Sequence, residues 1–306
     1  MRPSVRPIFS GGPLLALFLL ATGASAQTSE GLSSALGRIK NAHVVHLGYR
    51  ESSPPFSFLD QANRPIGYSL ELCEAIVDEI AIEVDDGDLK IEYVKVTPED
   101  RIQAVLQNRI DLECGSTTAN AERSKQVAFS PLMFVAGTRL MVPKASHVQS
   151  VTDLKGKTVV VTKGTTNEQA MHNADRKFSL GLNIVTAADH EQSYQMLADG
   201  KADAFATDDI LLYGLIARHK SQDKFHVVGD YLSYDPYGIM FRKGDPELAS
   251  VVERAFRKLG SNHDLIPLYE KWFTRRLPTG ERLNVAISPQ LEEAFHAMDD
   301  SPGANN

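Results

Sequence analysis

Short apolar runs alternate with amphipathic stretches from His43 onward, and this rhythm limits the fold more than any other feature of the chain. VVHLGY, LKIEYVKV and IDLECG are such runs, while YSLELCEAIVDEIA and PEDRIQAVLQNR between them have the apolar spacing of helices. Strands that alternate with helices predict βαβ units, in which helices cover both faces of a sheet. We therefore expect an α/β fold.

The alternation starts again after residue 157, with the runs TVVVTKG, LNIVTA and ADAFATDD. Two extended segments, 134–144 and 231–245, flank this second set, and the helical stretches beyond residue 245 return to the first set. The second lobe is therefore expected as an insertion in the first. Such an arrangement leaves a cleft between two lobes, and small ligands commonly bind in clefts.

The bounds of the parts follow from these segments. The chain ends in the polar run SPGANN, which is typical of a frayed terminus. We predict lobe 1 at 42–133 and 238–288, lobe 2 at 139–232, the hinge at 134–138 and 233–237, and a C-terminal tail at 289–306.

Residues 1–26 have the pattern of a secretory signal peptide. Arg2 and Arg6 precede the apolar run PLLALFLLATG, and Ala24-Ser25-Ala26 supplies the small residues of a cleavage site. The apolar run is too short to span a bilayer stably, although an uncleaved anchor is the alternative. We expect cleavage after Ala26 and export to the periplasm.

Charge and motif content exclude several classes of partner and site. Cleavage would remove two arginines and change the formal charge from −7 to −9, so no basic patch would remain to bind nucleic acid. No metal-ligand spacing, catalytic triad or phosphate-binding glycine loop appears, so we expect neither a metal nor a cofactor. Cys73 and Cys114 could form a disulfide in an oxidising compartment, or could remain two separate buried thiols.

The stretch ECGSTTANAER at 113–123 is the most informative polar segment. It follows a short apolar strand and offers the hydroxyls of Ser116, Thr117 and Thr118 together with the guanidinium of Arg123. These groups hold small anions well. The alternative is that the hydroxyls only cap a following helix.

Several stretches in this order resemble the periplasmic solute-binding proteins of ABC transporters that carry polar amino acids, and among them the members that bind glutamate and aspartate. The resemblance implies a type II periplasmic-binding-protein fold, whose two α/β lobes are joined by two crossing strands and close on the ligand like a hinge. The stretches that carry it include GYRESSPPFSF (48–58), ECGSTTANAER (113–123), AFSPLMFVAGTRL (128–140), DLKGKTVVVTKGTTNE (153–168), AADH (187–190), ATDD (206–209) and YGIMFRKGDP (237–246).

The resemblance also implies how the backbone groups of an amino acid would be held. Arg123 would bind the α-carboxylate through two parallel donors, assisted by Thr118 and by Thr165 or Thr166. The α-ammonium would donate to Ser116 and would be neutralised by Asp208. Asp209 beside it is the rival for this role and is the better candidate for a helix cap.

Specificity would depend on a second carboxylate of the ligand. By the same resemblance, Arg50 and Arg101 would bind it, and His190 would close on it from the other lobe. Pro98 stands where the family pattern has a serine, so one hydrogen-bond donor is missing there. Phe56 would either form an apolar wall over the ligand or belong to the core of its lobe.

These expectations describe a monomeric binding protein that is not an enzyme. It would capture L-glutamate or L-aspartate and deliver it to the membrane permease of an ABC transporter. Two alternatives stay open: a dehydratase-like enzyme on the same scaffold, with Asp208 or His190 as its acid or base, and an amino-acid sensor that docks on a signalling receptor.

Overall fold

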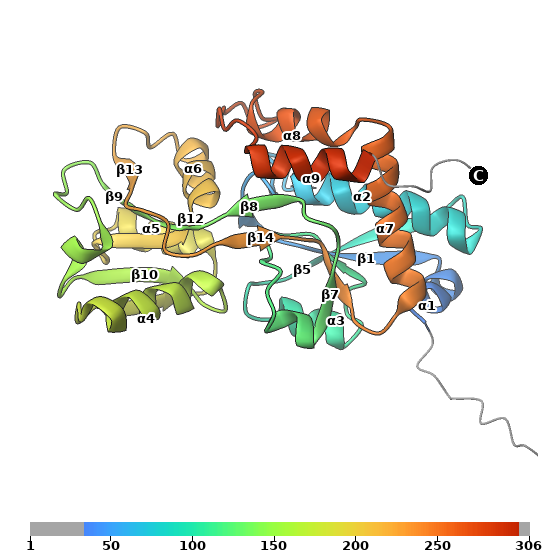
Figure 1. Cartoon of the computed structure of the whole chain (residues 1–306), viewed down its shortest axis with the longest axis horizontal. Coiled ribbons are helices and arrows are strands. Elements are labelled where there is room, and N and C mark those ends of the chain that lie inside the picture. The colour runs from blue at the N-terminus through green and yellow to red at the C-terminus, as the bar shows by residue number, and fades with distance from the viewer. Residues whose placement is uncertain (1–33, 300–306) are drawn as a thin grey trace, which may run out of the picture. The chain divides into compact units, whose positions relative to one another are not determined.

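The computed structural model of the protein describes residues 34–299 (Figure 1). The predicted signal peptide lies outside these residues. Within them the chain folds into two lobes, each built on its own five-stranded sheet. Of the helices in this part of the chain, none combines the length and apolar character needed to cross a bilayer.

The sheet of lobe 1 has the strand order β5-β1-β6-β15-β7. Strand β1 runs parallel to β5 and β6, whereas β15 runs antiparallel to β6 and β7. Because β15 follows all of lobe 2 in the sequence, lobe 2 is an insertion in lobe 1, as predicted. The strands are β1 (Val44–Tyr49), β5 (Lys90–Lys95), β6 (Leu112–Glu113), β7 (Val127–Phe129) and β15 (Met240–Arg242).

The sheet of lobe 2 repeats this arrangement with the order β11-β10-β12-β9-β13. Its first three strands are parallel, and β9 runs antiparallel to β12 and β13. The prediction of an α/β fold with two lobes is thus confirmed. The strands are β9 (Thr138–Pro143), β10 (Thr158–Thr162), β11 (Asn183–Ala187), β12 (Ala204–Asp208) and β13 (Phe225–Val228).

Two short antiparallel strands, β8 (Phe134–Ala136) and β14 (Asp235–Tyr237), run between the two sheets (Figure 1). They lie in the two extended segments that the sequence assigned to the hinge. A second small sheet, which follows β1 in lobe 1, consists of β2 (Ser52–Ser53), β3 (Ser57–Leu59) and β4 (Pro65–Ile66). The residue bounds proposed for the lobes remain a prediction.

Several helices begin where a side chain satisfies one of the first backbone N–H groups. Thr165, Asp189 and Asp245 each accept a hydrogen bond from a backbone N–H three residues later. The helices of lobe 1 are α1 (Ala35–Ala42), α2 (Tyr68–Val84), α3 (Arg101–Leu106), α7 (Pro246–Ser261), α8 (Leu265–Phe273) and α9 (Pro289–Asp299), and those of lobe 2 are α4 (Thr166–Phe178), α5 (His190–Ala198) and α6 (Asp209–Arg218), with 3₁₀ turns at Arg123–Lys125 and Val151–Leu154.

The predicted C-terminal tail is helical over most of its length. Leu291 and Phe295 are buried against the core of lobe 1, so α9 packs on the lobe through an i, i+4 pair of apolar side chains. The sequence reasoning did not identify this pair, and the fraying that it predicted for SPGANN concerns residues beyond this helix. Residues 300–306 lie outside the described part of the chain.

The two cysteines form a disulfide that the sequence left undecided. Cys73 of α2 is bonded to Cys114, which directly follows β6, with an S–S distance of 2.13 Å and a separation of 41 residues. The bond therefore ties a core helix to the strand that leads into the loop at 115–123.

Candidate ligand-binding site

Every residue that the sequence predicted to bind ligand, except Phe56, lies at or beyond the carboxyl end of a parallel strand. In α/β folds ligands bind outside these ends. Arg50 follows β1, Arg101 follows β5, Ser116, Thr118 and Arg123 follow β6, Thr165 and Thr166 follow β10, His190 follows β11, and Asp208 ends β12.

The structure brings the three arginines together in the interior. Arg50, Arg101 and Arg123 have only 1%, 2% and 8% of their surface exposed. Burial and the neighbouring charge of Arg101 lower the pKa of Arg50 and of Arg123 to about 9, and burial lowers that of Arg101. The guanidinium groups therefore form a buried cationic cluster.

Several buried polar atoms around this cluster have no hydrogen-bond partner among residues 34–299. They are Nη1 and Nη2 of Arg50, Nε of Arg101, Nε2 of His190, Oγ of Ser116 and Oε1 of Glu113. A buried donor without an acceptor costs about 1–3 kcal/mol. The nitrogen atoms of the two arginines can only donate, so this end of the cleft suits a ligand that brings acceptor oxygens.

Glu113, which the sequence reasoning missed, supplies the counter-charge. Its side chain is fully buried, accepts a hydrogen bond of 2.6 Å from Thr117 Oγ1, and acts electrostatically on all three arginines. A Cβ atom on Gly115 would lie 2.4 Å from Glu113 Oε1 and 3.0 Å from Arg50 Cγ, so a larger residue there would displace the Glu113 carboxylate. The position of Glu113 at the end of β6 was the available signal.

Arg123 reaches from lobe 1 to lobe 2. Its Nη1 donates to the carbonyl of Thr118 at 2.9 Å, and its Nη2 donates to the carbonyl of Gly164 at 3.4 Å. A 3₁₀ turn, and not an α-helix, begins at this residue. The alternative that the loop hydroxyls cap a following α-helix therefore does not apply.

The hydroxyls of Thr118 and Thr166 meet at Asp235 of β14, a second residue that the sequence reasoning missed. Thr118 Oγ1 donates to Asp235 Oδ1 at 3.0 Å, and Thr166 Oγ1 donates to the same atom at 2.8 Å. Both hydroxyl protons are thereby used, so neither hydroxyl remains as a donor to an anion. Thr165 caps α4 and donates to the carbonyl of Thr162 at 2.7 Å.

Asp208 is buried at the carboxyl end of β12 in lobe 2. Its Oδ1 accepts from Asn167 Nδ2 at 2.7 Å, and its Oδ2 accepts from the hydroxyl of Tyr237. Burial, reinforced by the charge of Asp235, raises its pKa to about 8. Asp209 instead accepts a hydrogen bond from the exposed Tyr231, which leaves Asp208 as the buried carboxylate.

His190 lies beside the arginines and contacts lobe 1. Its Nδ1 is 3.2 Å from Oγ of Ser53 on β2. Burial, together with Arg50 and Arg101, holds the pKa of His190 well below its usual 6.5. The imidazole is therefore neutral at physiological pH.

Phe56 does not join this group. Its fully buried ring packs edge-on against Tyr68, Phe134, Tyr237 and Phe273. This is the core alternative that the sequence left open. The aromatic cluster supports the hinge strands, since Phe134 lies on β8 and Tyr237 on β14.

Glycines allow the two lobes to approach closely at two contacts. A Cβ atom on Gly214 of α6 would lie 2.2 Å from the carbonyl oxygen of Pro54, and one on Gly164 would lie 2.9 Å from that of Pro98. Next to the second contact Lys163 pairs with Glu99 at 2.7 Å. The described conformation is therefore one in which the lobes are closed.

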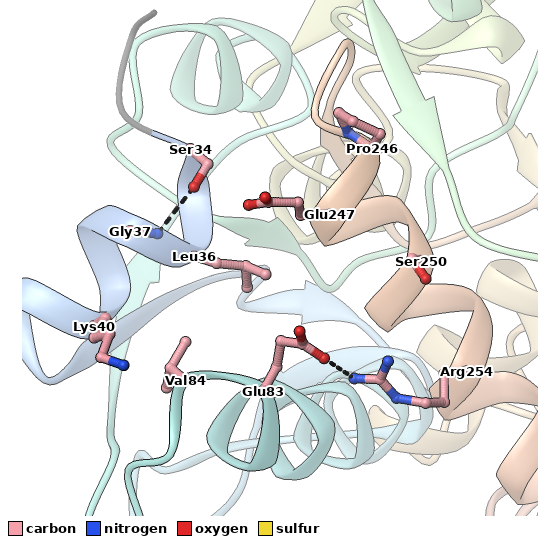
Figure 2. Close-up of a pocket in the computed structure, with 10 residues that line it drawn as sticks. All are labelled: Ser34, Leu36, Gly37, Lys40, Glu83, Val84, Pro246, Glu247, Ser250 and Arg254. Atoms are coloured by element: carbon pink, nitrogen blue, oxygen red, sulfur yellow. Dashed lines mark hydrogen bonds and ion pairs between the residues drawn. The ribbon is translucent and has the colours of Figure 1, made fainter.

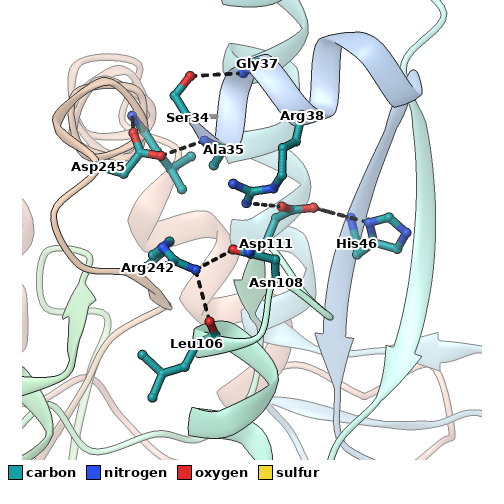
Figure 3. Close-up of polar contacts among 11 residues, drawn as sticks. Ser34, Ala35, Gly37, Arg38, His46, Leu106, Asn108, Asp111, Arg242 and Asp245 are labelled. Atoms are coloured by element: carbon teal, nitrogen blue, oxygen red, sulfur yellow. Dashed lines mark hydrogen bonds and ion pairs between the residues drawn. The ribbon is translucent and has the colours of Figure 1, made fainter. Parts of the chain in front are cut away.

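Two other features of lobe 1 involve none of the predicted ligand-binding residues. A surface pocket of about 540 Å³ lies between α1, α2 and α7 (Figure 2), is bordered by the 2.7 Å ion pair of Glu83 with Arg254, and includes none of the buried arginines. Nearby polar contacts join α1 to the sheet and to α7 (Figure 3). There Asp245 accepts from the backbone N–H of Ala35 at 2.7 Å, and Asp111 accepts from that of His46 at 2.9 Å.

Comparison with known proteins gives consistent results. The profile of the bacterial extracellular solute-binding proteins, family 3, matches residues 45–275. The "L-glutamate/L-aspartate-binding protein" of Pseudomonas aeruginosa is 40% identical over 94% of this chain and 96% of its own length. The "Glutamate/aspartate import solute-binding protein" of Salmonella typhimurium is 37% identical over 87% of this chain and 89% of its own.

Solved structures support the same fold. An ancestral arginine-binding protein bound to arginine superposes with a TM-score of 0.68 at 29% identity, covering 76% of this chain and 98% of that one. An ancestral amino acid-binding protein, a precursor of cyclohexadienyl dehydratase, gives a TM-score of 0.68 at 30% identity, covering 79% of this chain and all of that one, 100%.

Proposed function

The chain belongs to family 3 of the bacterial extracellular solute-binding proteins, and from this premise we propose that it captures L-glutamate and L-aspartate between its lobes and delivers them to the permease of an ABC transporter. The observation that carries the proposal is the buried cluster of three arginines, in which the free donors of Arg50 and Arg101 call for carboxylate oxygens. The names of the relatives point to the same ligands.

The α-carboxylate of the ligand would lie against Arg123. A planar carboxylate accepts two parallel hydrogen bonds from one guanidinium, and the N-terminus of α4, with Thr165 and Thr166, adds backbone N–H groups from the opposite lobe. The ammonium would donate to Ser116 and to Asp208, whose carboxylate oxygens retain lone pairs beyond those used by Asn167 and Tyr237.

The side-chain carboxylate of the ligand would lie between Arg50, Arg101 and His190. The buried acids Glu113, Asp208 and Asp235 offset part of the charge of the three arginines, yet Nη1 and Nη2 of Arg50 and Nε of Arg101 still lack acceptors, which favours a ligand with a second carboxylate. An unpaired charge in such a site costs several kcal/mol, so the second carboxylate is needed to make closure favourable.

The remaining assignments follow from the family. The named relatives are binding proteins and not enzymes, which disfavours the dehydratase-like alternative. Cleavage after Ala26, release into the periplasm as a monomer, and the predicted lobe bounds belong to this proposal. A sensor would use the same site but a different docking partner.

Calorimetric titration of the purified mature chain with L-glutamate, L-aspartate, L-glutamine and L-asparagine tests the proposal. We expect the two acids to bind with a Kd on the order of micromolar or better, which corresponds to roughly 8 kcal/mol or more. Absence of binding by both acids would contradict the proposed function.

Replacing Gly214 by alanine is expected to weaken binding without weakening the fold. Alanine favours a helix over glycine by about 1 kcal/mol, so α6 itself gains stability. Its methyl group, however, would overlap the carbonyl of Pro54 when the lobes close, and such overpacking costs about 1–3 kcal/mol. Calorimetry should show roughly 10- to 100-fold weaker glutamate binding, with a thermal midpoint of the unliganded protein that is unchanged or higher. Unchanged affinity would show that this contact is not made on closure.

Binding is expected to release a proton near neutral pH. Asp208 has a pKa of about 8 in the closed site, so it is largely protonated at pH 7, whereas an ammonium partner stabilises its ionised form. Affinity should therefore rise as the pH increases from 6 to 8. Titrations at pH 7 in buffers of different ionisation enthalpy would measure the released proton. An observed enthalpy that is independent of the buffer would exclude this role of Asp208.

A further inference from the structure

Ser53 forms a contact across the cleft that points to a role in ligand selection, if the proposed function holds. The residue lies on β2 of lobe 1 and is fully buried. Its Oγ is 3.2 Å from Nδ1 of His190, the first residue of α5 in lobe 2. The other ring nitrogen, Nε2, is buried and has no partner within residues 34–299.

The direction of this hydrogen bond follows because the buried hydroxyl proton of Ser53 requires an acceptor. Within the described part of the chain, His190 Nδ1 is the one acceptor with which the Ser53 hydroxyl forms a hydrogen bond. If Nδ1–H donated to Oγ, the buried hydroxyl proton would lack an acceptor, at a cost of about 1–3 kcal/mol. Donation from the serine to Nδ1 avoids this cost.

The direction in turn determines where the ring proton lies. Because Arg50 and Arg101 face His190 in a buried site, the ring is neutral and carries one proton. When Nδ1 accepts, that proton is on Nε2. His190 then presents an N–H donor beside the free donors of Arg50 and Arg101.

We propose that Ser53 is a positioning residue that fixes the tautomer of His190, so that Nε2–H faces the cleft as a donor and the site accepts a carboxylate in preference to an amide. With the opposite tautomer, the lone pair of Nε2 would repel a carboxylate oxygen and would accept from the NH₂ group of glutamine. Ser53 of lobe 1 thus determines whether Nε2 of His190 in lobe 2 donates a hydrogen bond to the ligand or accepts one from it.

A double-mutant cycle tests this role. The variants are Ser53→Ala, His190→Gln and their combination, with Ser52→Ala as the matched control, because Ser52 is the adjacent buried serine of the same strand. Ser53→Ala should weaken glutamate binding roughly tenfold, the size of one net hydrogen bond, and should lower the ratio of glutamate to glutamine affinity. It should have no further effect when His190 is already glutamine, whereas a purely structural role would weaken binding in both backgrounds.

Nitrogen-15 spectra of the imidazole groups in the glutamate-saturated protein provide the second readout, with the His190 signal assigned by its loss in His190→Gln. The wild type should show the proton on Nε2, and Ser53→Ala should show a mixture of tautomers. Equal glutamate affinity of Ser53→Ala and wild type, or a wild-type proton on Nδ1, would overturn the role of Ser53 alone. Failure of the wild type to bind glutamate or aspartate would overturn the proposed function and this inference with it.

Discussion

Arg123→Ala is expected to abolish binding of every amino acid, while Arg101→Ala is expected to weaken only the acidic ones. In the proposed mode Arg123 holds the α-carboxylate that all amino acids share, and it also bonds to Gly164 of the opposite lobe. Removing one partner of a buried charge pair costs about 2–5 kcal/mol, so glutamate affinity should fall by roughly 30- to 5,000-fold. Arg101 would contact only the second carboxylate.

Calorimetry of both variants with glutamate and glutamine measures this contrast. Arg176→Ala is the matched control, since this exposed arginine of α4 bonds to Asn173 on the surface. The ratio of glutamate to glutamine affinity should drop in Arg101→Ala and not in the control. If both buried-arginine variants bound glutamate as the wild type does, the assignment of these residues would be wrong.

Reduction of the disulfide is expected to lower the free energy of unfolding by roughly 4 kcal/mol. The bond between Cys73 and Cys114 closes a loop of 41 residues, and the restriction that such a loop places on the unfolded chain corresponds to an effect of this size. Urea unfolding of the oxidised protein and of the protein in a thiol reductant gives the difference directly, without any substitution.

The double variant Cys73→Ala/Cys114→Ala provides the control for the reductant. Its unfolding curve should be the same with and without the thiol. Coincident curves for the oxidised and the fully reduced wild type would show that the bond does not contribute to stability.

The sequence predicted the fold well because the relevant signals are local. Apolar periodicity located the strands and helices, and its restart after residue 157 revealed the inserted lobe. The gathering of Arg50, Arg101 and Arg123 followed from a resemblance, and the structure brings these residues together. Their ligand-binding roles remain a proposal.

Other parts of the site could not be predicted because they depend on which strand ends face each other. Glu113 looked like a strand residue, and Asp235 like part of an extended hinge segment, until the fold placed one beside the arginines and the other between two threonines. The same limit applied to the disulfide, since the sequence does not state how far a helix face lies from a strand end.

The division of the site between two sheets has one further consequence. Lobe 1 supplies the arginines, whereas lobe 2 supplies Asp208 and His190. In the proposed mode, a solute that first binds to one half therefore contacts only some of the residues that hold it in the closed state. A monocarboxylic amino acid could make that first encounter, yet would leave the guanidinium of Arg50 without an acceptor once the halves come together. In the proposed mode, the cost of that unpaired guanidinium arises on closure, so discrimination would be exercised mainly as the halves come together.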